Sequence, residues 1–575
     1  MPKDAASTKL TVSIGHYSEP GRKPENQDFC GARVPEGSAL SLKGITLAVA
    51  DGISSSATSA EAAEASVTAL LTDYYATSDA WTARTAATTV ISATNAWLYG
   101  QNAALSDMNA GKICTLSALI FKGRDGHVFH LGDSRIYRLV GEALEPLTTD
   151  HRAVLSNDES YLARGMGLDA QVAVDYRQVS LTLGDVFVLA TDGVHEVVES
   201  ADVIRALEAP DLDRAAAQLG QIAYERGSED NLTVMLARVE SLPEAELELD
   251  LAKLPLPPLP KAGDVIDGFR ILRPVNSTAR SHVFLAEGLM GEKVALKIPT
   301  VEMAEDPAYL NRFVLEEWIA RRLTSSHVLR AAKAPAERSA LYVVTEWVEG
   351  RTLRQWMDDH PAPDLDPDLD KVRDIVSQIV VGLRAFHRKE MLHQDLRPEN
   401  IMIDDAGTVK IIDLGSTSVA GVEEAAAGVL GHMPGTFQYT APEYFSGDFV
   451  TWRSDQYALG VIAYEMLTGR LPFGAEVARI QTRRDLLRLR YRSARDEDSP
   501  VPAWMDAALK RATQPDAARR YDALSEFVAE LKRPGQSWDA ARHVPLMEKN
   551  PLRFWQTVSA GLAGIVIVLT TLMMN

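Results

Sequence analysis

The chain has 575 residues, of which 46% are hydrophobic and 24% are charged, so collagen-like and wholly disordered proteins are excluded. Its 79 acidic side chains outnumber its 59 basic ones. The formal net charge of −20 excludes nucleic acid as a default partner, because an acidic surface repels phosphodiesters. Cys30 and Cys114 are too few to staple a chain of this length, which indicates a reducing compartment.

In residues 1–240, short apolar strands run directly into Asp-Gly or Gly-Asp pairs. These segments are ITLAVADG (45–52), HVFHLGDS (127–134) and DVFVLATDG (185–193), and a fourth acid lies in GSEDNLTV (227–234). One Asp-Gly pair is most often only a turn. Four acids placed at strand ends instead predict carboxylates that converge on hard divalent cations, which prefer oxygen ligands.

The same stretch resembles the metal-dependent, type 2C Ser/Thr protein phosphatases. The motifs that carry the resemblance are VADG (49–52), HLGDSRIYRL (130–139), LATDGV (189–194) and SEDNLTV (228–234), in the family's order. The resemblance implies a β-sandwich flanked by helices, with two Mg²⁺ or Mn²⁺ ions that activate a water molecule for attack on phosphorus.

By position in these motifs, the resemblance implies metal ligands on five residues. Asp51 would bridge both ions, Gly52 would offer its carbonyl, and Asp192 and Asp230 would hold the first ion. Asp28 completes the set of expected metal-site residues.

Two departures from the family pattern lie near the N-terminus of this domain. Gln27 stands where the family has a glutamate, which should weaken the second metal site because a charge is lost. Lys23, with Arg22 beside it, stands where the family has a phosphate-binding arginine. Lysine neutralises a phosphate but cannot grip it through two nitrogens. Three of the four expected metal carboxylates remain, and we expect an active phosphatase.

Residues 241–263 (SLPEAELELDLAKLPLPPLPKAG) contain five prolines and alternate acids with leucines. Proline cannot join a helix interior or a central strand, so this stretch predicts an extended, semi-rigid linker. It would separate the first domain, residues 1–240, from a second at 264–535.

The second domain is predicted to be rich in strands first and in helices later. Its strand candidates are 269–275, 281–287, 292–299 and 341–347, and its helix candidates are 307–323 and 454–467. The segments VALK (294–297), MLHQDLRPENIMID (391–404), VKIIDLG (409–415) and GTFQYTAPE (435–443) resemble eukaryotic-like Ser/Thr protein kinases. The resemblance implies a bilobal domain that uses Mg–ATP.

By position, the resemblance assigns each kinase residue a role. Lys297 would bind the ATP phosphates and pair with Glu316, Asp395 would accept the proton of the substrate hydroxyl, and Asn400 and Asp413 would hold Mg²⁺.

Five further residues take supporting roles. Arg397 would lie near the transferred phosphate, and Glu346 and Val348 would contact the nucleotide. Glu443 would pair with Arg520 in a structural contact.

Three substitutions qualify the kinase interpretation, and one of them, Arg397 in place of the family's lysine, keeps the positive charge. Residues 276–283 (NSTARSHV) stand where the family has a glycine-rich loop, and none of the three expected glycines is present. Gln394 replaces the arginine that in the family anchors a phosphorylated activation loop, so activity should depend less on phosphorylation there. The alternative is therefore an active phosphatase fused to a nucleotide-binding pseudokinase scaffold.

Near the end of the chain, residues 558–574 (VSAGLAGIVIVLTTLMM) form an uncharged run that Phe554 and Trp555 precede. The run predicts a transmembrane helix over 554–574 after a juxtamembrane segment, 536–553, although a buried core helix is the alternative. Lys549 and Arg553 on its N-terminal side predict that the catalytic domains lie in the cytoplasm, at a bacterial inner membrane.

The sequence as a whole predicts an α+β multidomain protein. We expect a bifunctional signalling enzyme that hydrolyses phospho-Ser/Thr with two Mg²⁺ or Mn²⁺ ions and transfers phosphate from Mg–ATP to protein Ser/Thr. Its partners would be phosphoproteins and protein substrates, its own kinase domain among them, and the membrane. A scaffold of two inactive domains would require both sites to fail.

Overall fold

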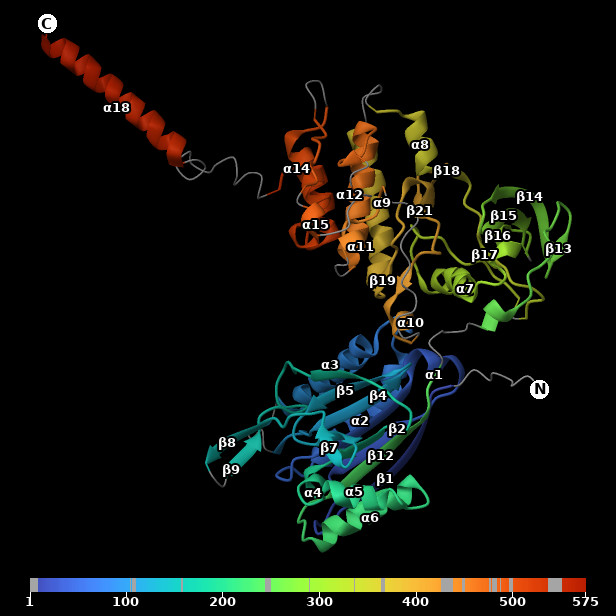
Figure 1. The fold of residues 1–575 in the computed structure, drawn as a ribbon, viewed down its shortest axis with the longest axis vertical. Coiled ribbons are helices and arrows are strands. Elements are labelled where there is room, and N and C mark those ends of the chain that lie inside the picture. The colour runs from blue at the N-terminus through green and yellow to red at the C-terminus, as the bar shows by residue number, and fades with distance from the viewer. Residues whose placement is uncertain are drawn as a thin grey trace.

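The structure is a computed structural model. It describes residues 9–103, 105, 110–156, 159–243, 250–288, 290–335, 337–362, 368–425, 438–446, 450–474, 477, 483–486, 488–495, 500–535 and 551–574. Figure 1 shows two bodies, a β-rich one built from the first part of the chain and a two-lobed one built from the second.

The first body is a sandwich of two antiparallel five-stranded sheets. One sheet has the order β1 (Thr11–Glu19), β12 (Leu232–Ser241), β11 (Val186–Ala190), β6 (Arg135–Val140), β7 (Ala143–Pro146). The other has the order β10 (Asp175–Ser180), β5 (Asp125–Leu131), β4 (Leu116–Lys122), β3 (Ile45–Asp51), β2 (Asp28–Arg33). The predicted strands that end in Asp-Gly or Gly-Asp are therefore present. β8 (Arg152–Ser156) and β9 (Glu159–Leu162) form a separate hairpin.

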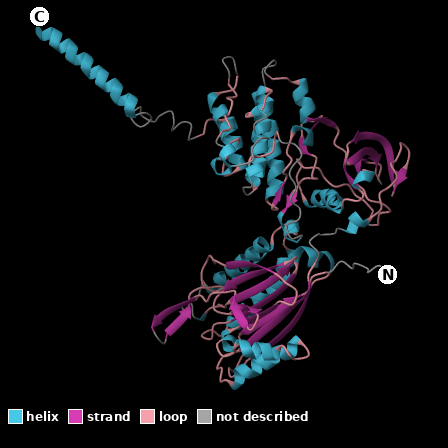
Figure 2. Cartoon of the chain, in the orientation of Figure 1, coloured by secondary structure: helices cyan, strands magenta, loops and turns pink. Residues whose placement is uncertain are grey.

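Helices cover both outer faces of this sandwich (Figure 2). α2 (Ser59–Ala76) and α3 (Ala83–Asn102) pack on the sheet that contains β3, whereas α5 (Ser200–Ala206) and α6 (Leu212–Glu225) pack on the other sheet. Short helices α1 (Gly37–Lys43) and α4 (Asp192–His195) fill loops.

Two glycines explain how closely α6 lies on β1. A Cβ on Gly220 would fall 2.1 Å from the Tyr17 ring, and one on Gly15 would fall 2.0 Å from the backbone of Leu212. A third apolar cluster, which includes Leu47, Phe121, Phe187 and Met235, fills the space between the sheets. The first domain is thus the predicted β-sandwich flanked by helices.

The smaller lobe of the second body is an antiparallel sheet with one long helix. The sheet has the order β13 (Val265–Ile266), β14 (Phe269–Ser277), β15 (Ser281–Glu287), β16 (Lys293–Pro299), β17 (Val343–Glu346), and the helix is α7 (Pro307–Arg322). All four predicted strands and the predicted helix are present. Asp306 caps α7 by accepting from the backbone N–H of Tyr309, and Pro307 suits its first turn.

The larger lobe is mostly helical. Its longer helices are α8 (Leu353–Asp359), α9 (Leu369–His387), α12 (Trp452–Thr468), α14 (Ala503–Ala512) and α15 (Leu524–Lys532). Its short helices are α10 (Ala420–Ala425), α11 (Glu443–Ser446) and α13 (Arg483–Leu486). Its short strands are β18 (Gly350–Thr352), β19 (Met391–Leu392), β20 (Ile401–Asp404), β21 (Val409–Ile411) and β22 (Ser418–Val419). α12 contains the predicted helix 454–467 and is buried along nearly its whole length.

The described end of the predicted linker packs on the smaller lobe. Residues Asp250–Lys253 form a 3₁₀ turn, and Leu251, Leu254 and Leu256 lie against the apolar cluster around Phe313 of α7. The carbonyl of Pro255 accepts from the backbone N–H of Leu341 at 2.8 Å. Leu251, Leu254 and Leu256 therefore hold this part of the linker on the kinase-like body, which a free spacer would not do.

Residues Pro551–Met574 form helix α18. Among the residues that the structure describes, no helix combines the length and the apolarity needed to cross a bilayer. The predicted membrane span over 554–574 therefore has no structural support. The side chains of 567–575 and the juxtamembrane residues 536–550 lie outside the described part of the chain.

Candidate functional sites

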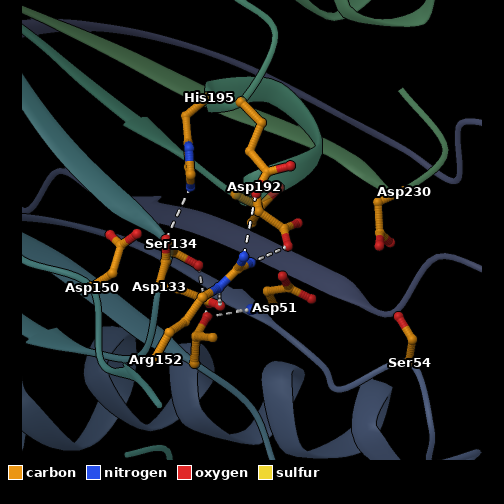
Figure 3. A network of polar contacts seen from close by, with 12 residues as sticks. Asp51, Ser54, Asp133, Ser134, Asp150, Arg152, Asp192, His195 and Asp230 are labelled. Atoms are coloured by element: carbon orange, nitrogen blue, oxygen red, sulfur yellow. Dashed lines mark hydrogen bonds and ion pairs between the residues drawn. The ribbon is translucent and has the colours of Figure 1, made fainter. Parts of the chain in front are cut away.

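The predicted metal-binding acids gather at one end of the sandwich (Figure 3). Asp28 and Asp51 lie opposite each other in the β2–β3 ladder, Asp192 begins α4, and Asp230 precedes β12. Burial raises the pKa of Asp192 to about 7, with the nearby carboxylates of Asp133 and Asp230 adding to the effect. Burial likewise raises the pKa of Asp51, as do its charged neighbours. Packing these anions together without a cation is therefore electrostatically unfavourable.

Two basic side chains enter this acidic cluster. The Arg152 guanidinium bonds Asp133 at 2.6 Å and Asp192 at 3.0 Å, and lies 3.4 Å from Glu196. Figure 3 shows it between Asp133, Asp192 and Asp51. Lys23 lies 3.3 Å from Asp230.

With these cations in place, no group of three His, Cys, Asp or Glu side chains among the described residues has a geometry that could hold a metal ion. The binuclear site therefore stays a prediction. The donor set nevertheless fits a hard cation, since it consists of oxygen atoms. Oδ1 of Asp28 is buried with no hydrogen-bond partner among the described residues, while Oδ2 accepts from Thr191 at 2.8 Å. Gly52 lies so close to α2 that a Cβ would fall 2.8 Å from Ser59.

The two predicted phosphate-binding residues point to different places. Nζ of Lys23 reaches the edge of the acidic cluster and donates to Ser54 at 2.9 Å. Arg22 lies over the Tyr224 ring and donates to the carbonyls of Tyr224 and Gly227, away from the cluster. Gln27 donates through Nε2 to the carbonyl of Ser56 at 2.7 Å.

Sequence reasoning missed one member of this cluster, Arg152. Asp133, in the Gly-Asp pair that follows β5, is among the strand-end acids expected to converge, although the family resemblance gives it no metal role. Arg152 comes from the β8–β9 hairpin, and an isolated arginine in a loop gives no sequence signal of its own.

The kinase-like body has a cleft of about 710 Å³ between its lobes. Lys297 on β16 and Glu316 on α7 both line it, and the lysine Nζ lies 2.7 and 2.9 Å from the two glutamate oxygens. Burial disfavours the charged ammonium, but the carboxylates of Glu316 and Asp413 outweigh that effect and raise the pKa of Lys297.

The predicted catalytic loop is held by buried polar contacts. Nδ2 of Asn400 donates to the backbone carbonyl of Asp395 at 2.9 Å and to its carboxylate at 3.0 Å. Burial raises the pKa of Asp395. Asp455 on α12 accepts from the backbone N–H groups of His393 and Gln394, both at 3.0 Å, which fixes the chain just before Asp395.

The remaining predicted kinase residues also line the cleft. Glu346, Val348, Asn400, Asp413 and Arg397 all contribute to its wall. The Glu346 carboxylate is already occupied, because it accepts from Lys410 at 2.7 Å and from a backbone N–H at 3.0 Å. The Glu346 side chain therefore holds the edge of the cleft in place.

The glycine-free loop is a tight turn between β14 and β15. Thr278 bonds the backbone of Ser281 on both sides, through its own N–H and its hydroxyl. The carbonyl of Arg280 accepts from the Tyr309 hydroxyl at 2.9 Å and from the backbone N–H of Thr300 at 2.9 Å. Side chains thus pin a turn that glycines would leave mobile.

The segment after Asp413 is ordered at both ends. β22 pairs with β19 beside the catalytic loop. Glu443 and Arg520 form the predicted buried pair at 2.8 Å, with both side chains nearly inaccessible to solvent. This prediction is confirmed. Residues 426–437 lie outside the described part of the chain.

Comparison with known families matches both bodies separately. The protein phosphatase 2C family matches residues 18–237, and the protein kinase domain family matches residues 278–529. The chain joins a phosphatase domain to a kinase domain. The predicted order of folds and the predicted enzyme classes are confirmed at this level.

Curated relatives match the kinase domain. The serine/threonine-protein kinase PrkC of Bacillus subtilis is 29% identical over 269 residues, which cover 46% of this chain and 40% of that protein. PknA of Corynebacterium glutamicum is 36% identical over 203 residues, or 34% of this chain and 41% of that protein. The chain thus spans about two fifths of the length of these relatives.

Solved structures match each domain over its whole length. The S. agalactiae serine/threonine phosphatase is 26% identical, with a TM-score of 0.36, and the match covers 40% of this chain and 100% of that one. The Mycobacterium tuberculosis PknI kinase domain is 23% identical, with a TM-score of 0.38, and the match covers 48% of this chain and 100% of that one.

Proposed function

We propose that this chain is a bifunctional enzyme that phosphorylates protein Ser/Thr residues and removes phosphate from them. The observation that carries the kinase half is the assembled cleft, in which the Lys297–Glu316 pair faces Asp413. Lys297 would bind ATP phosphates, Asp395 would accept the substrate hydroxyl proton, and Asn400 and Asp413 would hold Mg²⁺.

The convergence of acids at one end of the sandwich supports the phosphatase half. Asp51, Asp192, Asp230 and Asp28, with the Gly52 carbonyl, would hold two Mg²⁺ or Mn²⁺ ions. When bound, such ions lower the pKa of a bridging water and neutralise charge on the phosphoryl oxygens. Lys23 would attract the phosphate to the edge of this site.

Two assays on the full chain test the proposal. The first measures Mn²⁺-dependent hydrolysis of a phosphopeptide and compares the parent with Asp192→Asn. Loss of hydrolysis in the variant is expected, because a charged ligand is replaced by an amide. Hydrolysis that needs no metal, or that Asp192→Asn leaves unchanged, would contradict the phosphatase half.

The second assay measures transfer of labelled phosphate from ATP in the Asp192→Asn background, so that the phosphatase cannot remove the label. Transfer is expected to disappear when Asp395→Asn is added. Transfer equal to that of the Asp395→Asn control would show that the kinase half does not transfer phosphate.

One observation favours the alternative of a pseudokinase scaffold. The turn at 278–281 is pinned by hydroxyls where the family has mobile glycines, and Arg280 from this turn lines the cleft. Saturable ATP binding to the Asp192→Asn chain without any transfer would establish that alternative.

Membrane attachment is proposed from the sequence alone, on the uncharged run at 558–574. It predicts that the full chain floats with bacterial inner-membrane vesicles and that a chain ending at residue 550 does not. Equal recovery of both in the soluble fraction would exclude it.

A further inference from the structure

The two domains meet at the segment that follows the kinase metal ligand Asp413. Helix α10 of this segment lies against the end of β4 and the loop that joins α2 to α3 (Figure 1). Nζ of Lys122, at the end of β4, lies 2.7 Å from Oε2 of Glu424 in α10. The lysine side chain is fully buried and the glutamate is 12% exposed. A buried charge is tolerated only with such a partner, so neither side chain suits an undocked surface.

The phosphatase helix α3 begins at this interface, and two kinase carboxylates cap it. Glu424 accepts from the backbone N–H of Ala83 at 2.8 Å. Glu390 accepts from the backbone N–H of Thr82 at 2.9 Å and from the Thr85 hydroxyl at 2.6 Å. Anions at a helix N-terminus satisfy unpaired N–H groups and the helix dipole. Glu390 lies only five residues before Asp395, so the residue that caps α3 is close in the chain to the catalytic loop.

The backbones approach too closely here for ordinary side chains. Gly421 donates to the carbonyl of Ala80 at 2.9 Å, and a Cβ on Gly421 would lie 2.5 Å from the Trp81 carbonyl. Arg322, at the end of α7, pairs with Asp79 of the same loop at 2.9 Å. Residues 79–85, the end of the α2–α3 loop and the first turn of α3, therefore contact the helix that carries Glu316, Glu390 just before β19, and α10.

This interface lies at the far end of the sandwich from the acidic cluster. β3 begins at Ile45, beside the interface, and ends at Asp51, so about 20 Å of strand separates the two. β4 runs between the same two regions and ends at Lys122. The acidic cluster of the phosphatase domain does not face α10 in this arrangement. Any effect of the interface on the kinase domain therefore comes from binding and not from dephosphorylation of α10.

Gln394 stands beside Asp395, where the family has an arginine that anchors the activation segment. We propose that the phosphatase domain supplies that anchor: Lys122 and the 79–85 loop hold the activation segment in place, and phosphate transfer depends on this docking. In the docked arrangement β19 pairs with β22 and Lys297 pairs with Glu316, and docking would stabilise both contacts. The proposal rests on the kinase activity proposed above.

Two substitutions in the full chain test the docking, each with a matched control. Lys122→Met removes the buried charge at similar length, and Lys112→Met removes a lysine whose partner, Glu61, is largely exposed. Gly421→Ala places a Cβ against the Trp81 carbonyl, and Gly100→Ala places one where nothing lies within 4 Å.

Transfer is measured in the Asp192→Asn background and hydrolysis in the Asp395→Asn background. Lys122→Met and Gly421→Ala should each lower transfer about tenfold or more, because breaking a buried, hydrogen-bonded charge pair or wedging a packed contact shifts the docking equilibrium that far. Both controls should keep transfer within about twofold. Hydrolysis should be unchanged in all four variants, which also shows that the phosphatase domain is folded.

A readout independent of transfer separates this proposal from the kinase function. Hydrogen exchange in a peptide covering residues 413–425 should be slow in the parent and in both controls, and fast in Lys122→Met and Gly421→Ala. If the parent transfers no phosphate, the proposed kinase function fails and exchange alone decides the docking. Unchanged exchange, or unchanged transfer in an active parent, would overturn the proposal.

Discussion

The two sites of this chain differ in the charges that meet in them. In the kinase cleft, opposite charges already meet, since Lys297 bonds both oxygens of Glu316 and faces Asp413. In the phosphatase cluster, like charges meet, and Arg152 and Lys23 stand among them. The contrast shows that opposite charges stabilise each other in the first site, whereas the clustered carboxylates of the second site repel one another unless cations lie among them.

The largest expected effect comes from breaking the assembled site. Lys297→Met should lower phosphate transfer by about 10²–10³-fold, because it removes a fixed positive charge from the phosphates. Transfer measured in the Asp192→Asn background checks this. The same substitution should leave phosphopeptide hydrolysis by an otherwise parental chain unchanged. A parallel loss of hydrolysis would mean that the sites are not independent.

A second variant tests how much of the kinase half rests on buried pairing. Glu443→Gln leaves the Arg520 guanidinium buried without its charged partner. The free energy of unfolding of the kinase domain should fall by about 3–5 kcal/mol. Hydrogen exchange in α12, monitored as a function of urea concentration, measures this free energy of unfolding. Arg453→Ala breaks an exposed pair with Asp522 and should cost less than about 1 kcal/mol. Equal losses would show that burial is not what makes the Glu443 pair strong.

Acid should weaken the phosphatase half through a histidine outside the acidic cluster. Burial, together with the nearby His151, lowers the pKa of His130 to about 4. Below pH ~6.5 the unfolded chain binds a proton there that the folded domain does not, so stability is complete above that pH and falls toward pH 4.

The loss attributable to His130 should approach ~3 kcal/mol at the acid end. Hydrogen exchange of the amides in β4 and β5 gives the urea concentration at which the phosphatase domain is half unfolded. Its change from pH 7 to pH 4 checks the prediction. His130→Gln should flatten the profile, whereas His16→Gln, at an exposed site, should not. An unchanged slope in His130→Gln would exclude this residue as the cause.

The smallest expected effect concerns Arg152. Its guanidinium competes with a cation for Asp133 and Asp192, so Arg152→Ala should lower the Mn²⁺ concentration needed for half-maximal thermal stabilisation about three- to tenfold. Arg164→Ala, which breaks a half-exposed pair with Asp175, is the control. Weaker Mn²⁺ binding in Arg152→Ala would show instead that this arginine supports the site.

The sequence predicted those parts of the fold that local patterns determine. Strands β3, β5 and β11 follow from apolar runs that end in Asp-Gly or Gly-Asp, and helix α7 follows from its periodicity. The Glu443–Arg520 pair followed from the family resemblance.

Contacts between distant segments could not be predicted in this way. Arg22 and Lys23 are neighbours in the sequence, yet one binds the end of α6 and the other binds Asp230. Lys122 and Glu424 are 302 positions apart, and each looks like a surface charge in its own segment. No periodicity links such residues, because their encounter depends on how two folded bodies dock.

Because part of the linker packs on the smaller kinase lobe, only a short stretch of chain separates the two domains. β12 ends at Ser241 and the packed stretch begins at Asp250, so the two domains are tethered by residues 242–249, which reach about 30 Å at most. A tether this short gives each domain an effective concentration near the millimolar range around the other. An interface whose dissociation constant would be millimolar between separate molecules is therefore substantially occupied within one chain. Cutting the tether would release the two domains from each other with every interface side chain intact.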